Sequence, residues 1–410
     1  MVRSNKKTPQ KQTQETNSIA KTVLQPRPKI SINQVSNIAA DARAVLEAVR
    51  QVMLEPFPRK LPPEFIANQV ADLCDLTRSE FKSAEIKIKS TRGKIKEGDN
   101  FTSYTLEETI ELINLVAKLP KLPIKKQGKV IAIASYKGGV GKTTISMSLA
   151  QALTLRGLKV LFIDLDPQGS ATTLFGISPE IEVQYQETIM PFIYQDEPDL
   201  QYAIKKTYWH NLDLIAASSE VLGAEYVLPA NANKEGYIFW DQLNQGIKPL
   251  RDIYDVIVLD TSPSLGYLTQ NAMAMADGIL TPCPLEALDF ASLTQFYGVF
   301  TEISSLLPGY FEQKKFDFIG VIINKAKLEK DDFTTGNIIK SWIKNSFKEY
   351  LWDVIIPDSK IPKDTASQLK TVYDLSYDET KTTAYKRFRD PMDKLADQVL
   401  LELHEAWKRA

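Results

Sequence analysis

The feature that most constrains this chain is a glycine-rich loop between an apolar run and a helical pattern. Residues 130–144 read V-I-A-I-A-S-Y-K-G-G-V-G-K-T-T, and leucines follow at 149, 153 and 155. The apolar run predicts a buried strand, and the leucine spacing predicts a helix. Glycines let the backbone N–H groups approach a phosphate closely, and the helix that follows adds the positive end of its dipole. The sequence therefore predicts a phosphate-binding loop.

The residues of this loop have separate expected roles. Lys142 is placed to reach the β- and γ-phosphates, and the Thr143 hydroxyl to bind Mg²⁺. The usual pattern G-x-x-x-x-G-K-[ST] fails at its first glycine, because position 136 is Tyr, and Lys137 follows it. A glycine turn that binds nothing is disfavoured by the strand and helix on either side. The expected phosphate cradle is Gly138, Gly139, Val140, Gly141, Lys142, Thr143 and Thr144.

Two further apolar runs end in carboxylates. Residues 160–163 precede Asp164 and Asp166, and residues 256–259 precede Asp260. In α/β folds, ligands bind at the carboxyl ends of the strands. Two carboxylates beside a metal ion suffice for phosphoryl transfer, which is mostly positioning and charge neutralisation. Capping of the strand end is the alternative role for the pair at 164 and 166.

The three segments K-G-G-V-G-K-T-T, I-D-L-D-P-Q and V-I-V-L-D-T-S, taken in this order, resemble the ParA/MinD ATPases. The resemblance implies that ATP bridges two protomers and that Lys137 of one contacts phosphates bound by the other. It implies that Asp166 positions or activates the attacking water, and that Asp164 supports the Mg²⁺–water shell. It also implies that Asp260 binds Mg²⁺ through water, and that residues 261–266 with Asn271 sense the γ-phosphate. The resemblance places adenine recognition at Asn324 and Lys325, with a loop asparagine as the alternative, and Pro357 is a further expected cofactor contact.

The chain before this region divides by composition. We expect a disordered basic tail at 1–37, a helix at 38–55, a helix-turn-helix domain at 56–119, a linker at 120–128 and the ATPase domain at 129–410. The apolar stripe of the 38–55 helix needs a partner, which is either the next domain or a second copy. Residues 173–250 look like an insertion with one firm strand at 212–216. The last helix is expected at 391–409.

The helix-turn-helix pattern places Ala71 at the helix crossing, Asp75 at the turn and Thr77 at the cap of the second helix. A basic segment follows and resembles a wing that contacts phosphates. The alternative is a plain helical hairpin, because Asp75 stands where glycine is common. A further basic surface near Lys370 resembles the nonspecific DNA surface of related ATPases. The expected DNA contacts are Thr77, Arg78, Ser79, Lys82, Lys87, Lys89, Arg92, Lys94 and Lys370.

Bulk properties limit the class of protein. The formal net charge is −1, so affinity for nucleic acid must come from local patches. Cys74 and Cys283 lie far apart in sequence and fit a reducing cytosol. Acidic residues on the polar face of the 391–409 helix disfavour a membrane-surface role, so we expect no membrane partner.

These observations predict a doubly wound, mostly parallel α/β P-loop ATPase with an N-terminal all-α, winged helix-turn-helix domain. The resemblance implies a Mg²⁺-dependent ATPase for DNA (plasmid) partition, whose ATP-bridged homodimer binds nucleoid DNA nonspecifically. It implies that a centromere-binding ParB-like partner stimulates turnover, and that the N-terminal domain is an operator-binding autorepressor. The location would be cytoplasmic and nucleoid-associated. Two alternatives remain: a MinD-like membrane-cycling ATPase, and a transcription regulator that uses ATP as an allosteric ligand.

Overall fold

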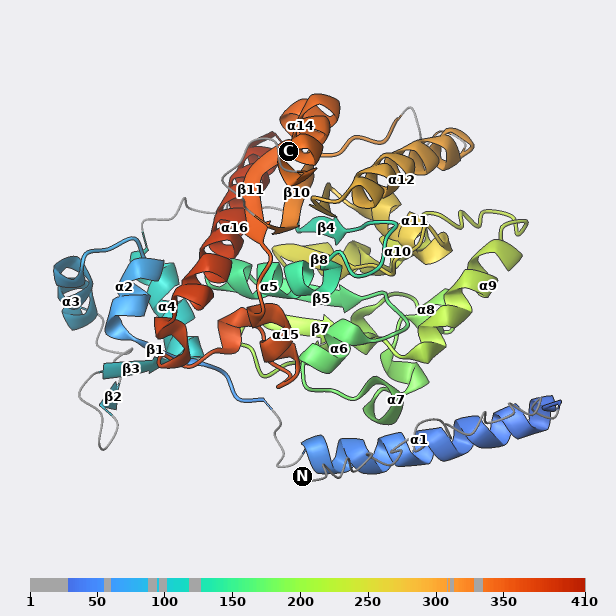
Figure 1. Ribbon diagram of the computed structural model, residues 1–410, viewed down its shortest axis with the longest axis horizontal. Coiled ribbons are helices and arrows are strands. Elements are labelled where there is room, and N and C mark those ends of the chain that lie inside the picture. The colour runs from blue at the N-terminus through green and yellow to red at the C-terminus, as the bar shows by residue number, and fades with distance from the viewer. Residues whose placement is uncertain are drawn as a thin grey trace, which may run out of the picture. The chain divides into compact units, whose positions relative to one another are not determined.

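The computed structural model describes residues 29–54, 60–87, 94–95, 102–117, 127–307, 309, 313–327 and 335–409 (Figure 1). The contacts between residues divide the chain into two units, Met1–Met53 and Leu54–Ala410. Within the described residues, no helix has the length and apolar character needed to cross a membrane.

The second unit contains an eight-stranded sheet in the order β11-β10-β9-β4-β8-β5-β7-β6. Neighbouring strands are parallel except β6, which is antiparallel to β7. Because the predicted strands alternate with helices, this is the doubly wound architecture expected from the sequence. The strands are β4 (Lys129–Ile133), β5 (Val160–Asp164), β6 (Lys205–Lys206), β7 (Leu212–Ile215), β8 (Val256–Asp260), β9 (Gly278–Pro284), β10 (Phe318–Ala326) and β11 (Leu351–Pro357).

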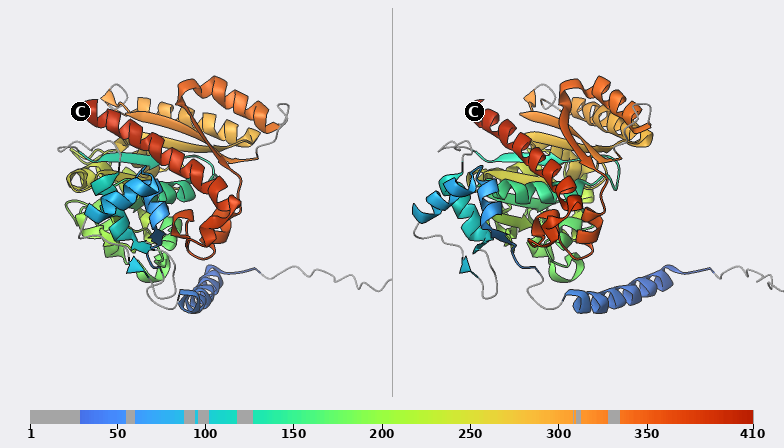
Figure 2. Two further views of the ribbon diagram at one scale, coloured as in Figure 1. Left: turned by 90° about the vertical axis from the view of Figure 1, so that its left-hand side faces the viewer. Right: turned by 60° about the vertical axis from the view of Figure 1, so that its left-hand side comes forward.

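Alternating residues of the central strands enter two hydrophobic clusters on opposite faces of the sheet. In β4, Ile131 and Ile133 join one cluster while Val130 and Ala132 join the other. The first cluster is covered by α5 (Lys142–Thr154) and α16 (Thr383–Arg409), and α16 runs along the sheet beside β11 (Figures 1 and 2). The second is covered by short helices, which are α8 (Met190–Ile193), α9 (Ala224–Ala230), α10 (Gln242–Ile247) and α11 (Tyr267–Met275).

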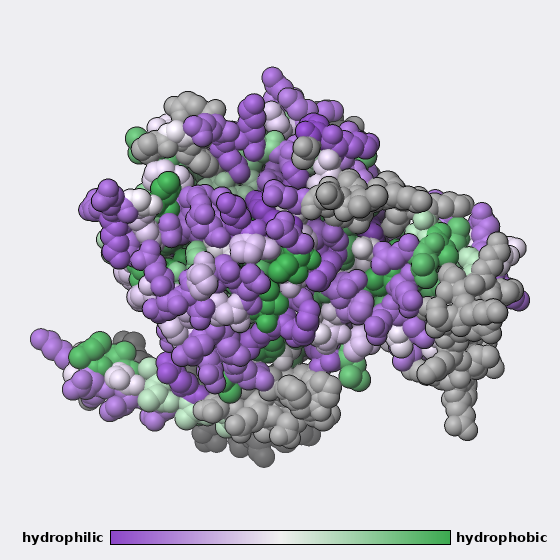
Figure 3. All heavy atoms as spheres, turned by 180° about the vertical axis from the view of Figure 1, so that it is seen from behind, coloured by the Kyte–Doolittle hydropathy of each residue, from purple (hydrophilic) through white to green (hydrophobic). Residues whose placement is uncertain are grey.

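The first unit contains one helix, α1 (Ile32–Leu54), among its described residues. It begins six residues before the predicted start at 38, so the end of the predicted disordered tail is helical. The cause is a capping box: the Gln34 N–H donates to Ser31 Oγ at 3.3 Å, and the Ser31 N–H donates to Gln34 Oε1 at 2.9 Å. Apolar side chains of α1 are exposed (Figure 3): Ile32, Val35, Ile38 and Val45.

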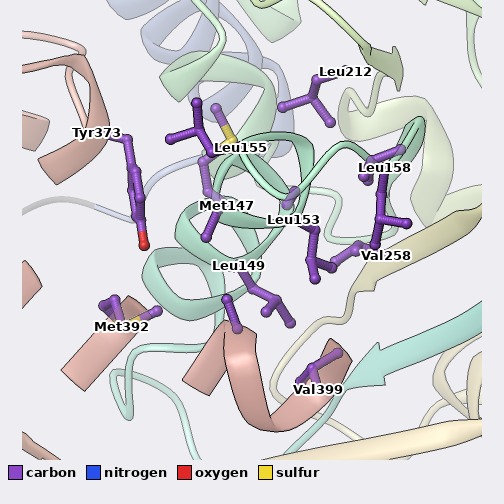
Figure 4. Close-up of a cluster of buried hydrophobic side chains, with 14 of the residues drawn as sticks. Met147, Leu149, Leu153, Leu155, Leu158, Leu212, Val258, Tyr373, Met392 and Val399 are labelled. Carbon is purple, nitrogen blue, oxygen red and sulfur yellow. The ribbon is translucent and has the colours of Figure 1, made fainter. Parts of the chain in front are cut away.

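The core beside α5 joins side chains from distant parts of the chain. Figure 4 shows Leu149 and Leu153 of α5 in one cluster with Met392 and Val399 of α16 and Val258 of β8. The same cluster continues into the N-terminal domain through fully buried side chains such as Val70, Tyr104 and Ile110. The N-terminal domain therefore shares its hydrophobic core with the sheet.

That N-terminal domain is not all-α as predicted, because three short strands accompany its helices in a winged helix-turn-helix arrangement. Its elements are β1 (Glu64–Ile66), α2 (Ala67–Leu73), α3 (Arg78–Lys87), β2 (Lys94–Ile95), β3 (Thr102–Thr105) and α4 (Leu106–Val116). The three strands form an antiparallel sheet in the order β1-β3-β2. Asp75 has φ 52°, the left-handed conformation that explains why glycine is common at such a turn. Thr77 caps α3, because the Glu80 N–H donates to Thr77 Oγ1 at 3.2 Å.

Residues 173–250 are more regular than the sequence indicated. Besides β6 and β7 they contain α8, α9, α10 and α7 (Pro179–Glu182), following α6 (Ser170–Leu174). The strand predicted at 212–216 is present as β7, and the helices α8, α9 and α10 add core residues of the second cluster that no sequence pattern indicated. These helices are too short for the apolar spacing of a helix to be evident.

The C-terminal helix also begins earlier than predicted. Pro391 lies inside α16, which starts at Thr383. Proline removes one hydrogen bond from a helix. Here the preceding turn is stabilised by Arg389, whose Nε donates to Asp393 Oδ2 at 2.7 Å and whose Nη1 donates to Tyr385 Oη at 2.9 Å. The remaining helices are α12 (Ala287–Ser305), α14 (Thr335–Phe347) and α15 (Ile361–Ala366).

Candidate nucleotide-binding site

A cavity of about 410 Å³ lies at the carboxyl ends of the central strands. One end is lined by the glycine-rich loop with Asp166, Ser170 and Pro263. The other end is lined by the last residues of β10 and β11, by the two residues after β11, and by α15 and α16. Nine of the ten predicted cofactor contacts come together here, beside the predicted catalytic Asp166: Gly138, Gly139, Gly141, Lys142, Thr143, Thr144, Asn324, Lys325 and Pro357. The tenth, Val140 of the same loop, is not in the cavity lining and is buried, with an exposed fraction of 3%.

The loop needs its glycines. Gly139 has φ 74° and Gly141 has φ 95°, which L side chains rarely adopt. A Cβ on Gly141 would also lie 2.5 Å from Asn324 Nδ2. Asn324 Nδ2 donates to Val140 O at 2.6 Å, and Lys325 Nζ donates to Gly139 O at 2.5 Å. Asn324 and Lys325 thus contact the backbone of the loop directly.

Lys142 is buried at the phosphate end of the cavity, with an exposed fraction of 7%. Its Nζ donates to Lys137 O at 3.3 Å and lies 3.4 Å from Ser135 Oγ. Burial lowers the pKa of Lys142, and the charges of Asp260 and Asp166 oppose that shift. These two contacts are long, so a phosphate oxygen would be a stronger acceptor for this ammonium group.

Asp164 and Asp260 end adjacent strands in register and are fully buried. Asp164 accepts from the Thr172 N–H at 2.9 Å, Thr172 Oγ1 at 2.8 Å and the Asp166 N–H at 3.1 Å. Among the described residues, neither oxygen of Asp260 has a well-formed hydrogen bond. Burial raises the pKa of Asp260, and the nearby Asp164 raises it further. The hydroxyls of Thr143 and Ser146 act in the opposite direction.

A buried carboxylate without a hydrogen-bonding partner needs a cation or a proton. Asp260 beside the Thr143 hydroxyl offers oxygen ligands, which Mg²⁺ prefers. The residues present therefore fit a magnesium ion. Asp164 is fixed beside Asp260, because its oxygens accept hydrogen bonds from Thr172 and the Asp166 backbone. Asp166 lines the cavity, and its Oδ1 accepts from the Gln168 N–H at 3.0 Å.

Lys137 does not line this cavity. Its Nζ lies 2.7 Å from Asp289 Oδ1 on α12, and the exposed fractions of the two side chains are 39% and 4%. The hydrogen bond that Lys137 donates to Asp289 raises the pKa of Lys137. Lys137 is thus paired within its own protomer, outside the lining of the cavity.

Sequence reasoning missed the far wall of the cavity. Asp358 and Ser359 follow the predicted Pro357 directly, so the rule that ligands bind beyond strand ends would have found them. Lys363 of α15 and Phe388 of α16 had no such signal, because folding alone brings them to the loop. Asn271 is buried, and its amide contacts Phe239 O at 2.7 Å and the Leu243 N–H at 3.2 Å.

The predicted DNA contacts divide into three groups. On α3, Arg78, Ser79 and Lys82 are exposed, as the helix-turn-helix pattern predicts. Lys370 is half-buried, and its Nζ lies 3.4 Å from Glu379 Oε1. Lys87 ends α3 and Lys94 begins β2, but their side chains, like Lys89 and Arg92 altogether, lie outside the described residues.

Known proteins are similar to this chain both in sequence and in fold. A family model described as an AAA domain matches residues 128–309. The chromosome partitioning protein ParA of Myxococcus xanthus is 36% identical over 230 residues, which cover 56% of this chain and 75% of that protein. A solved structure titled "Partition Protein" has a TM-score of 0.61 at 20% identity and covers 90% of this chain and 98% of its own.

A second solved structure has the same fold over the ATPase region. It is cobyrinic acid a,c-diamide synthase from Mycobacterium smegmatis with bound ADP and magnesium, with a TM-score of 0.51 at 24% identity. The match covers 67% of this chain and 94% of that one. Residues of the first two segments that resemble ParA/MinD ATPases thus line one cavity in a matching fold, and the third segment places Asp260 opposite Asp164 at the end of β8. The chain belongs to the ParA family of partition ATPases.

Proposed function

We propose that this chain is a Mg²⁺-dependent ATPase that segregates DNA, in particular a low-copy plasmid. The observation that carries the proposal is Asp260, a buried carboxylate without a well-formed hydrogen bond, beside Thr143 and Lys142 at one end of a cavity lined by the glycine loop. The fold neighbour with ADP and magnesium supports this choice of ligands.

Each residue would act on the phosphates or on water. A bound Mg²⁺ would neutralise phosphate charge and orient the terminal phosphate. Thr143 and Asp260 would bind it, Asp260 through water, and Asp164 would support that arrangement through its contacts with Thr172. Lys142 would bind the β- and γ-phosphates in place of its long contacts with Lys137 O and Ser135. Asp166 would orient the attacking water from the cavity wall.

We further propose that ATP bridges two protomers. Lys137 would leave Asp289 and contact the phosphates of the partner subunit. The exposed apolar side chains of α1 would provide a second, nucleotide-independent contact between copies. The dimer would bind nucleoid DNA nonspecifically, and a ParB-like centromere-binding protein would stimulate turnover. Without ATP, α3 would bind an operator as an autorepressor, with Arg78 and Lys82 in the major groove.

The first experiment measures binding to a random-sequence duplex with no nucleotide, with ADP–Mg²⁺ and with ATP–Mg²⁺, over a salt series. Tight, salt-sensitive binding only with ATP is the expected result, because phosphate contacts give such a slope. Binding that ignores nucleotide would contradict the partition role and favour a transcription regulator. No DNA binding in any state would favour a membrane-cycling ATPase.

The same preparation tests the chemistry. Lys137→Ala is expected to abolish hydrolysis although its side chain lies outside the cavity of its own protomer. Asp166→Ala is expected to bind ATP–Mg²⁺ and leave it uncleaved. Normal hydrolysis by Lys137→Ala would rule out the ATP-bridged dimer.

A further inference from the structure

Glu225 of α9 caps the beginning of α11, a helix that lies far from it in the sequence. The Tyr267 N–H donates to Glu225 Oε2 at 2.6 Å and the Leu268 N–H donates to Oε1 at 3.1 Å. These N–H groups begin α11, whose own capping residue is Gly266. A Cβ on Gly266 would lie 2.5 Å and 2.6 Å from the two carboxylate oxygens. Glycine at 266 therefore leaves the space that the carboxylate of Glu225 occupies.

A carboxylate suits this position better than a neutral group. The N–H groups of the first helical turn have no partner within the helix. They carry the positive end of the helix dipole, so a negative charge there is stabilising. Hydrogen bonds to a carboxylate are also stronger than those to a neutral acceptor. Glu225 thus fixes the beginning of α11 with both oxygens.

The segment that ends at this cap begins beneath the glycine loop. Thr261 follows β8, and its Oγ1 donates to Ile133 O, the last residue of β4, at 3.0 Å. Between the two fixed ends, Pro263 lines the nucleotide cavity. A Cβ on Gly138 would lie 3.8 Å from Pro263 Cβ. The 261–266 segment is therefore bonded to β4 at its start and to α9 just after its end, and Pro263 between these points lines the cavity beside the glycine loop.

We propose that Glu225 is a positioning residue for nucleotide turnover. By capping α11 it fixes the end of the 261–266 segment, and this places Pro263 and its neighbours against the terminal phosphate. Glu225 itself does not line the cavity. The inference rests on the ATPase activity proposed above and adds to it a residue from the 173–250 region. A small displacement of a positioning segment is enough to slow a reaction strongly.

The test compares Glu225→Ala and Glu225→Gln with the wild-type full-length chain. Turnover is measured as Mg²⁺-dependent phosphate release, and affinity is measured for ADP–Mg²⁺ and for AMPPNP–Mg²⁺. Glu225→Ala is expected to lower kcat about tenfold or more. It should lower AMPPNP affinity about fivefold or more and change ADP affinity less than about twofold. Glu225→Gln should recover part of both effects, because its amide oxygen still accepts a hydrogen bond.

Glu235→Ala is the matched control, because Glu235 is an exposed glutamate of the same region. Turnover and AMPPNP affinity within about twofold of wild type in both Glu225 variants would overturn the proposal. An equal loss of ADP and AMPPNP affinity would also overturn it, since that result indicates general loosening of the fold. A wild-type chain without turnover would refute the proposed hydrolysis, and the ratio of the two affinities would still decide the role of Glu225.

Discussion

The nucleotide cavity and the exposed face of α3 differ in what their basic side chains contact before any ligand binds. In the cavity, Lys142 contacts Lys137 O, and Lys325 donates to Gly139 O. On α3, Arg78 and Lys82 project from the surface as exposed side chains. A ligand in the cavity must therefore replace internal contacts, whereas the DNA that we propose to bind at α3 would replace water and counterions. Mutations in the cavity should therefore disturb internal contacts of the fold as well as contacts to the ligand, whereas mutations on α3 should disturb only the proposed contacts to DNA.

Of all the variants, Lys142→Ala should have the largest effect, and that effect should be confined to the nucleotide cavity. It removes the ammonium group nearest the expected phosphates and should lower turnover about 100- to 1,000-fold. Operator binding in the absence of nucleotide should stay unchanged, because α3 is a separate surface. Phosphate release and a DNA-binding titration measure the two quantities. Lys344→Ala, at an exposed lysine of α14, is the control. A parallel loss of operator affinity would mean that the two regions are not independent.

A buried cluster connects the two regions. Lys60, which precedes β1, donates to Asp374 Oδ2 at 2.8 Å, and the exposed fractions of the two side chains are 5% and 3%. Tyr208 Oη also donates to Asp374, at 2.6 Å, and Gln151 of α5 donates to Tyr208 Oη at 3.0 Å. Burial lowers the pKa of Lys60, so the ammonium group depends on its partner. The cluster stabilises the contact between the winged-helix domain and α5, the helix that follows the glycine loop.

Asp374→Asn should therefore destabilise the second unit by about 3 kcal/mol, because it leaves Lys60 charged, buried and without its carboxylate. Urea unfolding measures the change in free energy. Replacing both charges, as Lys60→Met with Asp374→Leu, should restore much of the stability, since an apolar pair carries no uncompensated charge. If Asp374→Asn alone were as stable as wild type, the buried ion pair would not be what holds the two regions together.

Arg78→Ala tests the exposed side of the comparison. It should weaken binding to an operator duplex about tenfold, the usual loss for one contact to a base edge. Nucleotide turnover should be unaffected. Lys234→Ala removes an exposed positive charge far from α3 in sequence and serves as the control. Equal losses in the two variants would indicate that net charge, and not the α3 face, determines DNA binding.

The structural features that the sequence predicted correctly are those set by residues close together in the chain. The strand, glycine loop and helix at 129–154 are contiguous, and the Thr77 cap with Asp75 lies within one turn, so local rules found them. The early start of α1 was also predictable, because Ser31 and Gln34 form a capping box that is visible in the sequence.

Contacts between distant segments were not predictable from a single sequence. Lys60 and Asp374 are 314 residues apart, and Glu225 lies 42 residues from the N–H that it caps. Neither spacing matches a helix or strand period. Phe388 reaches the cavity because α16 packs on α5, which no local pattern indicates. The sequence thus located the phosphate end of the cavity and left its far wall and its supports to tertiary packing.

Asp289→Asn has the smallest expected effect. It tests whether the ion pair between Lys137 and Asp289 competes with the proposed dimer or orients Lys137 for it. If the proposed dimer needs Lys137 in the partner's phosphate site, the ion pair within the protomer competes with dimer formation. A partly exposed pair of this kind contributes about 0.5 kcal/mol, and the dimer would break one pair in each protomer, so releasing Lys137 should favour the ATP-dependent dimer about fivefold. Sedimentation with AMPPNP–Mg²⁺ measures the dimer, and the ADP state is the control. A weaker dimer in Asp289→Asn would show instead that Asp289 orients Lys137 for its partner, and the pair would then belong to the assembled site.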